Sequence, residues 1–262
     1  MLSMLSNAQD LTRRLVTTAA EVFCLVGTAV GTGLLGTSVD QTGGGALSDQ
    51  ATLVAPYGPA FSIWSVVYLG LLAFTVYQWS DRGLPRLRRL GYLPALSMVL
   101  NAVWILVAQT GLVWLTAVVI LALLAVLAVI GLRLGDAREE GAVGALVVDG
   151  TFGLYLGWVA VATCANLAAA LVDLGLEPGP GAADVLGVVV VLVAGAVAVA
   201  LAWRLGGRVA VALAMAWGLA WVAVGRFAGE PASTPVAVAA VVAAVAALVA
   251  VPLFRRRHSP AA

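Results

Sequence analysis

Three stretches of the sequence carry aromatic and amide side chains at helical spacing. Trp64 and Tyr68 are four residues apart. Asn101 precedes Trp104 by three residues. Residues at these separations share one face of an α-helix. A third stretch repeats the pattern over three helical turns and contains Tyr155, Trp158, Ala162 and Asn166. Aromatic faces stack on flat apolar molecules and amides bond to polar edges, so these residue types predict a ligand pocket.

Purely structural roles compete with this prediction. Asn side chains join helices inside a membrane without any ligand, and Trp packs well between helices. Trp and Tyr also gather at the two membrane–water interfaces, a role that we expect for Trp79, Tyr92, Trp114 and Trp203. Trp217 and Trp221 are four apart and are predicted to pack between helices. The spacing alone therefore leaves a pocket and plain helix packing both open.

The residue types that most covalent or metal chemistry requires are missing. The chain has no Lys, which excludes a Schiff base with retinal or pyridoxal. Its single histidine, His258, lies four residues from the C-terminus. Cys24 and Cys164 fall in apolar runs, where Cys behaves as a small hydrophobic residue. We therefore expect no metal site and no required cofactor.

The composition is that of a membrane protein. Hydrophobic residues make up 62% of the 262 residues and charged residues only 10%, with a mean hydropathy of +1.05. Soluble domains average about 25% charged residues. This excludes a soluble enzyme, a disordered chain and a nucleic-acid-binding protein.

Eight segments are long and apolar enough to cross a bilayer as helices, which takes about 20 residues. They are Leu15–Leu35, Ala60–Trp79, Gly91–Ala108, Leu112–Leu132, Leu146–Val172, Val185–Trp203, Val209–Val224 and Val236–Phe254. The fold class that follows is all-α, a polytopic membrane helix bundle. The first segment contains Glu21 and exceeds a usual signal-peptide core, so we expect it to be a retained span.

The arginines predict the orientation. Cytoplasmic loops retain positive charge, and eight spans with a cytoplasmic N-terminus place every arginine except Arg226 on the cytoplasmic side. The opposite loops carry the acidic residues Asp40, Asp49, Asp173, Glu177 and Glu230. Both termini are therefore predicted to be cytoplasmic.

The aromatic stretches resemble the signature regions of the TspO/translocator protein family, the tryptophan-rich sensory proteins. The resemblance rests on Pro56-Tyr57-Gly58-Pro59-Ala60-Phe61-Ser62-Ile63-Trp64 with Tyr68, on Asn101-Ala102-Val103-Trp104, and on Tyr155-Leu156-Gly157-Trp158 with Ala162 and Asn166. It covers about residues 13–172 and implies a five-helix ligand-binding bundle. Residues 183–254 are then a three-helix transmembrane extension, with cytoplasmic tails at 1–12 and 255–262.

The resemblance implies an integral protein of the bacterial plasma membrane that binds porphyrins, haem-like tetrapyrroles or other flat hydrophobic molecules. The implied pocket lining is Trp64, Tyr68, Asn101, Trp104, Tyr155, Trp158, Ala162 and Asn166, with Tyr57 in a lid formed by the first loop. Any catalysis would be light-dependent porphyrin degradation that uses Trp64 and Trp158. The implied partners are a hydrophobic ligand and membrane lipid, and Gly27-x-x-x-Gly31 offers a close-packing surface, within the bundle or across a homodimer.

The sequence departs from the family pattern in several places. The first loop has Tyr57 and Phe61 where the family usually carries Trp, and Leu154 replaces a Pro. Val107-Ala108 stands where a Phe pair is usual. The segment Asn166–Gly175 has neither Tyr nor a basic residue, so we expect no sterol-recognition motif there.

Two further functions stay open. A secondary transporter of a small hydrophobic solute is the main alternative, with Glu21 as a proton relay inside the membrane. A scaffold without any ligand is the other. For Asp149 we expect a helix-capping role, because it lies near the start of the fifth span, where the helix dipole favours negative charge.

Overall fold

The computed structural model describes residues 2–80, 84–135 and 141–257, and this part of the chain is helical without strands. The long helices are α1 (Leu2–Gly31), α2 (Ile63–Tyr77), α4 (Leu93–Gln109), α5 (Val113–Gly135), α7 (Thr151–Asp173), α8 (Pro180–Arg204), α9 (Val209–Ala228) and α10 (Thr234–Arg257). The short ones are η1 (Val39–Gly45), η2 (Gly58–Ser62), α3 (Leu84–Leu90), α6 (Ala142–Gly144) and η3 (Ala145–Gly150). The predicted all-α membrane bundle is confirmed.

Each predicted span has its helix. Within the described residues, seven helices are long and apolar enough to cross a membrane, and α3 and α4 together form an eighth candidate bent by 50°. The bend lies at Gly91, whose φ is +60°. Glycine adopts this backbone conformation readily because it has no Cβ. The first helix is longer at its N-terminus than predicted and ends at Gly31, so Leu35 belongs to the following loop rather than to the span.

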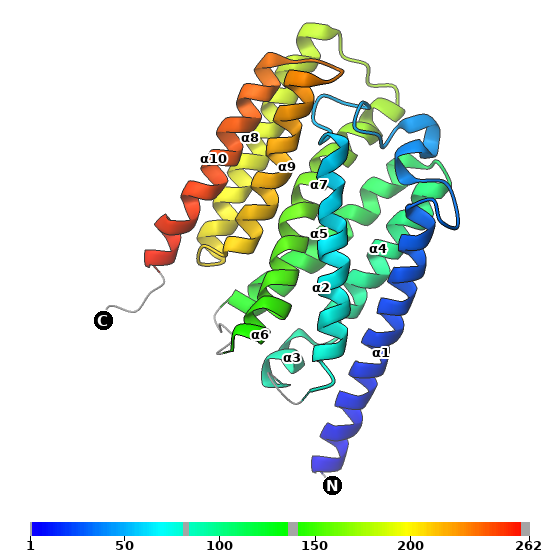
Figure 1. The fold of residues 1–262 in the computed structure, drawn as a ribbon, viewed down its shortest axis with the longest axis vertical. Helices are drawn as coiled ribbons and strands as arrows, with labels where there is room; N and C mark the ends of the chain where they lie inside the picture. The colour runs from blue at the N-terminus through cyan, green and yellow to red at the C-terminus, as the bar shows by residue number, and fades with distance from the viewer. Residues whose placement is uncertain (1, 81–83, 136–140, 258–262) are drawn as a thin grey trace.

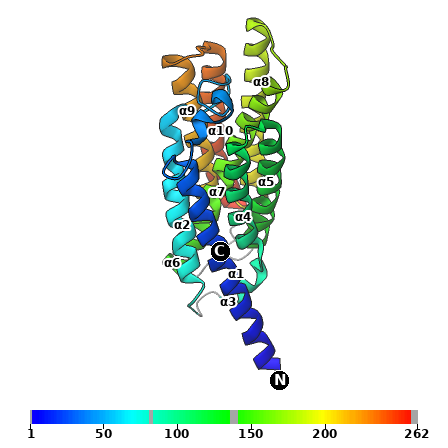
Figure 2. The same ribbon diagram turned by 90° about the vertical axis from the view of Figure 1, so that its right-hand side faces the viewer.

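The helices form two groups that meet at α7 (Figures 1 and 2). In the first group, α1 packs on α4, α4 on α5 and α5 on α7, while α2 lies beside α1 and α7. In the second, α8 and α9 both pack on α10, and α9 lies against α7. Successive spans alternate in direction, so α10 ends at the end of the bundle at which α1 begins.

Small residues allow the closest helix contacts. A Cβ at Gly157 of α7 would overlap the carbonyl oxygen of Val211 in α9 and would lie 2.9 Å from the Ala214 methyl group. Gly27 and Gly31 of α1 lie against Ala102 and Ile105 of α4, so the Gly-x-x-x-Gly surface is used inside the bundle. Van der Waals packing of this kind holds membrane helices together, because lipid is as apolar as the side chains.

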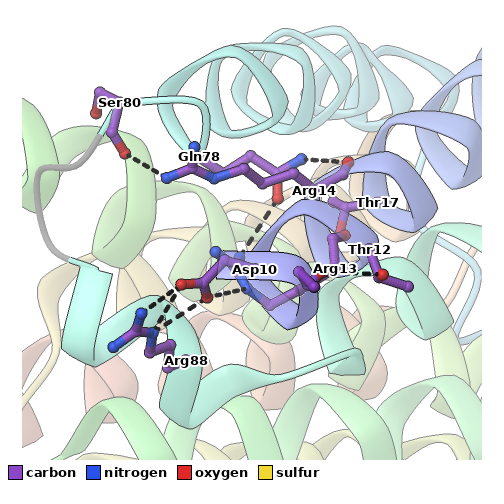
Figure 3. Close-up of polar contacts among 9 residues, drawn as sticks. Asp10, Thr12, Arg13, Arg14, Thr17, Gln78, Ser80 and Arg88 are labelled. Atoms are coloured by element: carbon purple, nitrogen blue, oxygen red, sulfur yellow. Dashed lines mark hydrogen bonds and ion pairs between the residues drawn. The ribbon is translucent and has the colours of Figure 1, made fainter. Parts of the chain in front are cut away.

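The end of the bundle at which α1 begins holds an arginine network, shown in Figure 3. Asp10 of α1 accepts hydrogen bonds from Arg88 of α3, with 3.0 Å from Nε to Oδ2. Arg13 donates to Gln78 at the end of α2, and the Gln78 amide donates to the Arg14 carbonyl at 3.2 Å. These contacts connect α1 to α2 and α3.

A second polar cluster at the same end joins the two helix groups. Asp149 accepts from Arg86 of α3, at 3.0 Å from Nη1 to Oδ2, and from Arg208 at the start of α9. Arg208 also donates to the Leu134 carbonyl of α5. Asp149 lies in η3, a π-helical turn, and not in the first turn of an α-helix. The expected capping role is therefore wrong, and Asp149 is the counter-ion of two arginines from separate helices.

Candidate functional site

Two adjoining cavities lie between the long first loop, residues 32–62, and the helices of the first group. The inner cavity has a volume of about 60 Å³ and the outer cavity about 410 Å³. Residues that line both are Val39, Leu47, Phe61, Trp64 and Trp104. The two cavities therefore adjoin at Trp64 of α2 and Trp104 of α4, and residues of the loop border both.

Aromatic rings from α2 and α7 meet at Trp64. Its ring stacks on Tyr68, one turn further along α2, at 5.3 Å between centroids and 15° between planes. It meets Tyr155 and Trp158 of α7 edge-on, at 5.9 Å and 6.2 Å. Phe61 of η2 approaches the Trp158 ring edge-on at 5.6 Å. Edge-to-face and offset-stacked pairs are the favoured geometries, so the ring contacts stabilise this cluster.

Both amides are hydrogen-bonded to side chains of neighbouring helices. Asn101 accepts the Tyr68 hydroxyl at 3.0 Å, which joins α4 to α2. Asn166 accepts the Trp104 indole N–H at 3.1 Å and donates to Thr116 at 2.8 Å, which joins α7 to α4 and α5. The amides thus act as the helix-joining groups that the sequence left open as an alternative. Both residues also border the inner cavity. They therefore join the helices around the site and form part of its lining.

The structure places the candidate residues as follows. The inner cavity is bordered by Trp64, Asn101, Trp104, Trp158, Ala162 and Asn166, and the outer cavity by Trp64, Tyr68 and Trp104. Two candidates border neither. Tyr155 is fully buried and donates its hydroxyl to the Ser97 carbonyl at 3.2 Å, behind Trp64. Tyr57 turns away from the cavities and lies 6.2 Å from the Trp221 ring of α9.

Two residues that border the inner cavity each have a buried polar atom without a partner among the described residues. These atoms are Nε1 of Trp158, whose side chain is 0% exposed, and Oγ1 of Thr52 in the loop. A buried donor without an acceptor costs about 1–3 kcal/mol. A ligand with a hydrogen-bond acceptor, or a water molecule, would relieve this cost at Trp158.

Helix α9 holds the loop in place, which the sequence did not reveal. Arg226, 1% exposed, donates to the carbonyls of Asp49 at 3.0 Å and Thr52 at 3.1 Å. The Trp217 indole donates to the Ala60 carbonyl at 2.9 Å, and the Tyr57 amide donates to the Trp221 carbonyl at 3.2 Å. The one signal in the sequence was Arg226 itself, the single arginine on the acidic side of the predicted topology.

The comparisons with known proteins agree with this architecture. A family model described as TSPO-like protein matches residues 17–253. The chain belongs to the TSPO-like protein family. The match runs through α8, α9 and α10, beyond residues 13–172 that carry the sequence resemblance. Neither a curated protein nor a solved structure matches the chain.

This TSPO-like protein also buries a carboxylic acid in α1. Glu21 is 2% exposed, and neither of its oxygens has a hydrogen-bond partner within the described residues. The side chain therefore does not pair with Arg14. It lies two helical turns below Thr28, on the same helix face, and Thr28 borders the outer cavity.

Proposed function

We propose that this protein is a membrane ligand-binding protein that holds a flat hydrophobic molecule, of porphyrin-like or similar shape, beneath its first loop. The observation that carries the proposal is the pair of cavities that meet at Trp64 and Trp104. A flat apolar ligand would stack on these rings, with the loop as its cover. Ligand sites of this kind are concave, largely apolar and bordered by a few polar groups.

The experiment is a fluorescence titration of the protein in nanodiscs with protoporphyrin. We expect saturable quenching and at least about tenfold weaker binding in Trp64→Ala and Trp158→Ala, because aromatic anchors in buried pockets dominate affinity. Trp114→Ala is the matched control, because Trp114 is 47% exposed on α5 and borders neither cavity. Quenching that does not saturate, or an equal loss in the control, would contradict the proposal.

A secondary transporter is the second candidate, and Glu21 is the observation that favours it. A buried ionisable group without a partner in a membrane helix is typical of proton pathways. In proteoliposomes, proton-coupled uptake of a hydrophobic solute should then be abolished by Glu21→Gln. Uptake that is absent in the wild-type protein, or unchanged in the variant, would remove this candidate.

The distribution of charge supports an orientation for the bundle. The arginines of α3, α5 and α8 gather at the end where α1 begins, while Asp40 and Asp49 lie at the other end. We propose that the arginine-rich end, with both termini, faces the cytoplasm, because cytoplasmic ends retain positive charge. Protease access to tags at either terminus in oriented vesicles tests this placement.

A further inference from the structure

Among the residues that the structure describes, the polar ones that border the outer cavity are acidic or neutral. Its lining residues include the acidic residues Asp40 and Asp49 and the hydroxyl-bearing residues Thr28, Thr32 and Ser65. The described residues that border either cavity include no Arg or Lys. An anionic group of a ligand would therefore meet two carboxylates and no counter-charge from this lining.

The arginine that contacts the loop over the cavities does not border them. Arg226 donates to the backbone carbonyls of Asp49 and Thr52, is buried, and borders neither cavity. The Asp49 carboxylate uses Oδ2 to accept the Gly58 amide at 2.9 Å. Asp40 has an exposed side chain. Asp40 and Asp49 thus place negative charge beside a molecule that enters the outer cavity, although Arg226 weakens the field of Asp49.

The aromatic lining favours the same sign of charge. Trp64, Tyr68, Trp104 and Phe61 border the outer cavity. Aromatic faces carry negative charge density and attract cations within about 6 Å of the ring centre. Trp158, which borders the inner cavity, supplies an independent sign of a ligand, because its N–H is a buried donor without an acceptor in the part of the chain that the structure describes.

We infer that the preferred ligand is a flat organic cation, with its apolar ring between Trp64 and Trp104 and its positive group near Asp40 and Asp49. This rests on the proposed ligand-binding function and narrows it to one chemical class. A hydrogen-bond acceptor at the inner end of such a molecule would accept from Trp158. Anionic molecules of the same shape bind more weakly, because their charge meets like charge at the rim.

Three acridones that differ only in the end of an N-propyl arm test the inference. The arm ends in trimethylammonium, hydroxyl or carboxylate, and the ring carbonyl supplies the acceptor. Binding is measured by tryptophan quenching in nanodiscs of zwitterionic lipid, which favour neither charge. We expect the cation to bind roughly three- to tenfold more tightly than the neutral compound, and the anion more weakly still. Added salt should shrink the difference.

Charge-neutral variants identify the groups responsible. Asp40→Asn with Asp49→Asn should reduce the affinity for the cation toward that for the neutral acridone, while neutral binding stays the same and the aromatic rings retain a smaller preference for the cation. The side-chain amide oxygen that Asp49→Asn introduces can still accept the Gly58 amide, so the loop keeps this contact. Glu177→Gln is the control, because Glu177 is exposed at the same end and borders neither cavity.

The outcomes separate this inference from the proposed function. Equal affinity for all three acridones, or an unchanged cation preference in the double variant, would overturn the inference and leave the ligand site in place. Absence of saturable binding by every acridone and by protoporphyrin would overturn both.

Discussion

Arg226→Met is the most direct test of the contact between α9 and the loop over the cavities. The guanidinium makes two hydrogen bonds, 3.0 Å to the Asp49 carbonyl and 3.1 Å to the Thr52 carbonyl. Hydrogen bonds to a charged group contribute about 1.5–3 kcal/mol each. Methionine fills a similar volume and is apolar, so the variant removes both bonds without opening a large void.

The desolvation cost of burying Arg226 reduces the net stabilisation that its two hydrogen bonds provide. Arg226 is 1% exposed and its Nε has no partner within the described residues, so its desolvation is only partly compensated. We therefore expect a net loss of about 2–4 kcal/mol for the closed loop, less than the sum of the two bonds. At about 1.4 kcal/mol per factor of ten, the opening equilibrium rises roughly 30- to 1000-fold.

Hydrogen–deuterium exchange of peptides that cover residues 46–60 measures this opening. The reporting amides are Ala55, which donates to the Thr52 carbonyl, and Tyr57, which donates to the Trp221 carbonyl. Both should exchange faster in the variant. Arg204→Met is the matched control, because Arg204 is exposed at the opposite end of the bundle, over the Trp203 ring. Unchanged exchange in Arg226→Met, or the same increase in the control, would refute the reasoning.

Three further substitutions test the packing and the buried charges by thermal unfolding in detergent. Gly157→Ala should destabilise the protein by about 1–3 kcal/mol, because its methyl group would overlap the Val211 carbonyl oxygen. The control is Gly181→Ala, which should leave stability unchanged because a Cβ there meets open space. Asp149→Asn should cost about 3–5 kcal/mol, because it removes the counter-ion of the buried Arg86 and the partly buried Arg208. An unchanged midpoint would show that the ion pairs are not needed. Glu21→Met should raise the midpoint, since it removes an unpartnered carboxyl that costs about 1–3 kcal/mol, and a lowered midpoint would mean that Glu21 has a stabilising partner.

The membrane helices could be predicted because their causes are local. A bilayer requires every backbone group to be satisfied within the helix, so apolar length alone indicates a span. The prediction for aromatic residues at the membrane–water interfaces also depends only on local sequence. The four residues concerned are exposed on the bundle: Trp79, Tyr92, Trp114 and Trp203. Helix boundaries were less accurate, because α1 ends at Gly31 rather than at Leu35 and a π-helical turn around Asp149 precedes α7.

The candidate site was predictable in part. Helical spacing placed Trp64 with Tyr68, and Asn101 with Trp104, on common faces that do point to the cavities. Spacing could not reveal that Thr116 would accept the Asn166 amide, because the two residues belong to separate helices. It also could not show that Tyr57 would turn toward α9, which the family resemblance placed in the lid.

By itself, the sequence determined that this chain is a membrane helix bundle, which residues share a helix face, and which end carries the arginines. These properties follow from apolar length, a period of 3.6 residues and charge, and none requires a partner helix. The tertiary structure alone decided which polar groups are paired. It showed that Arg226 contacts a loop 174 residues earlier in the chain. It also showed that the described residues lining the cavities include acidic residues but no arginine. Such pairings depend on the reach and direction of side chains from helices that are adjacent in space, and no local pattern in the sequence encodes that adjacency.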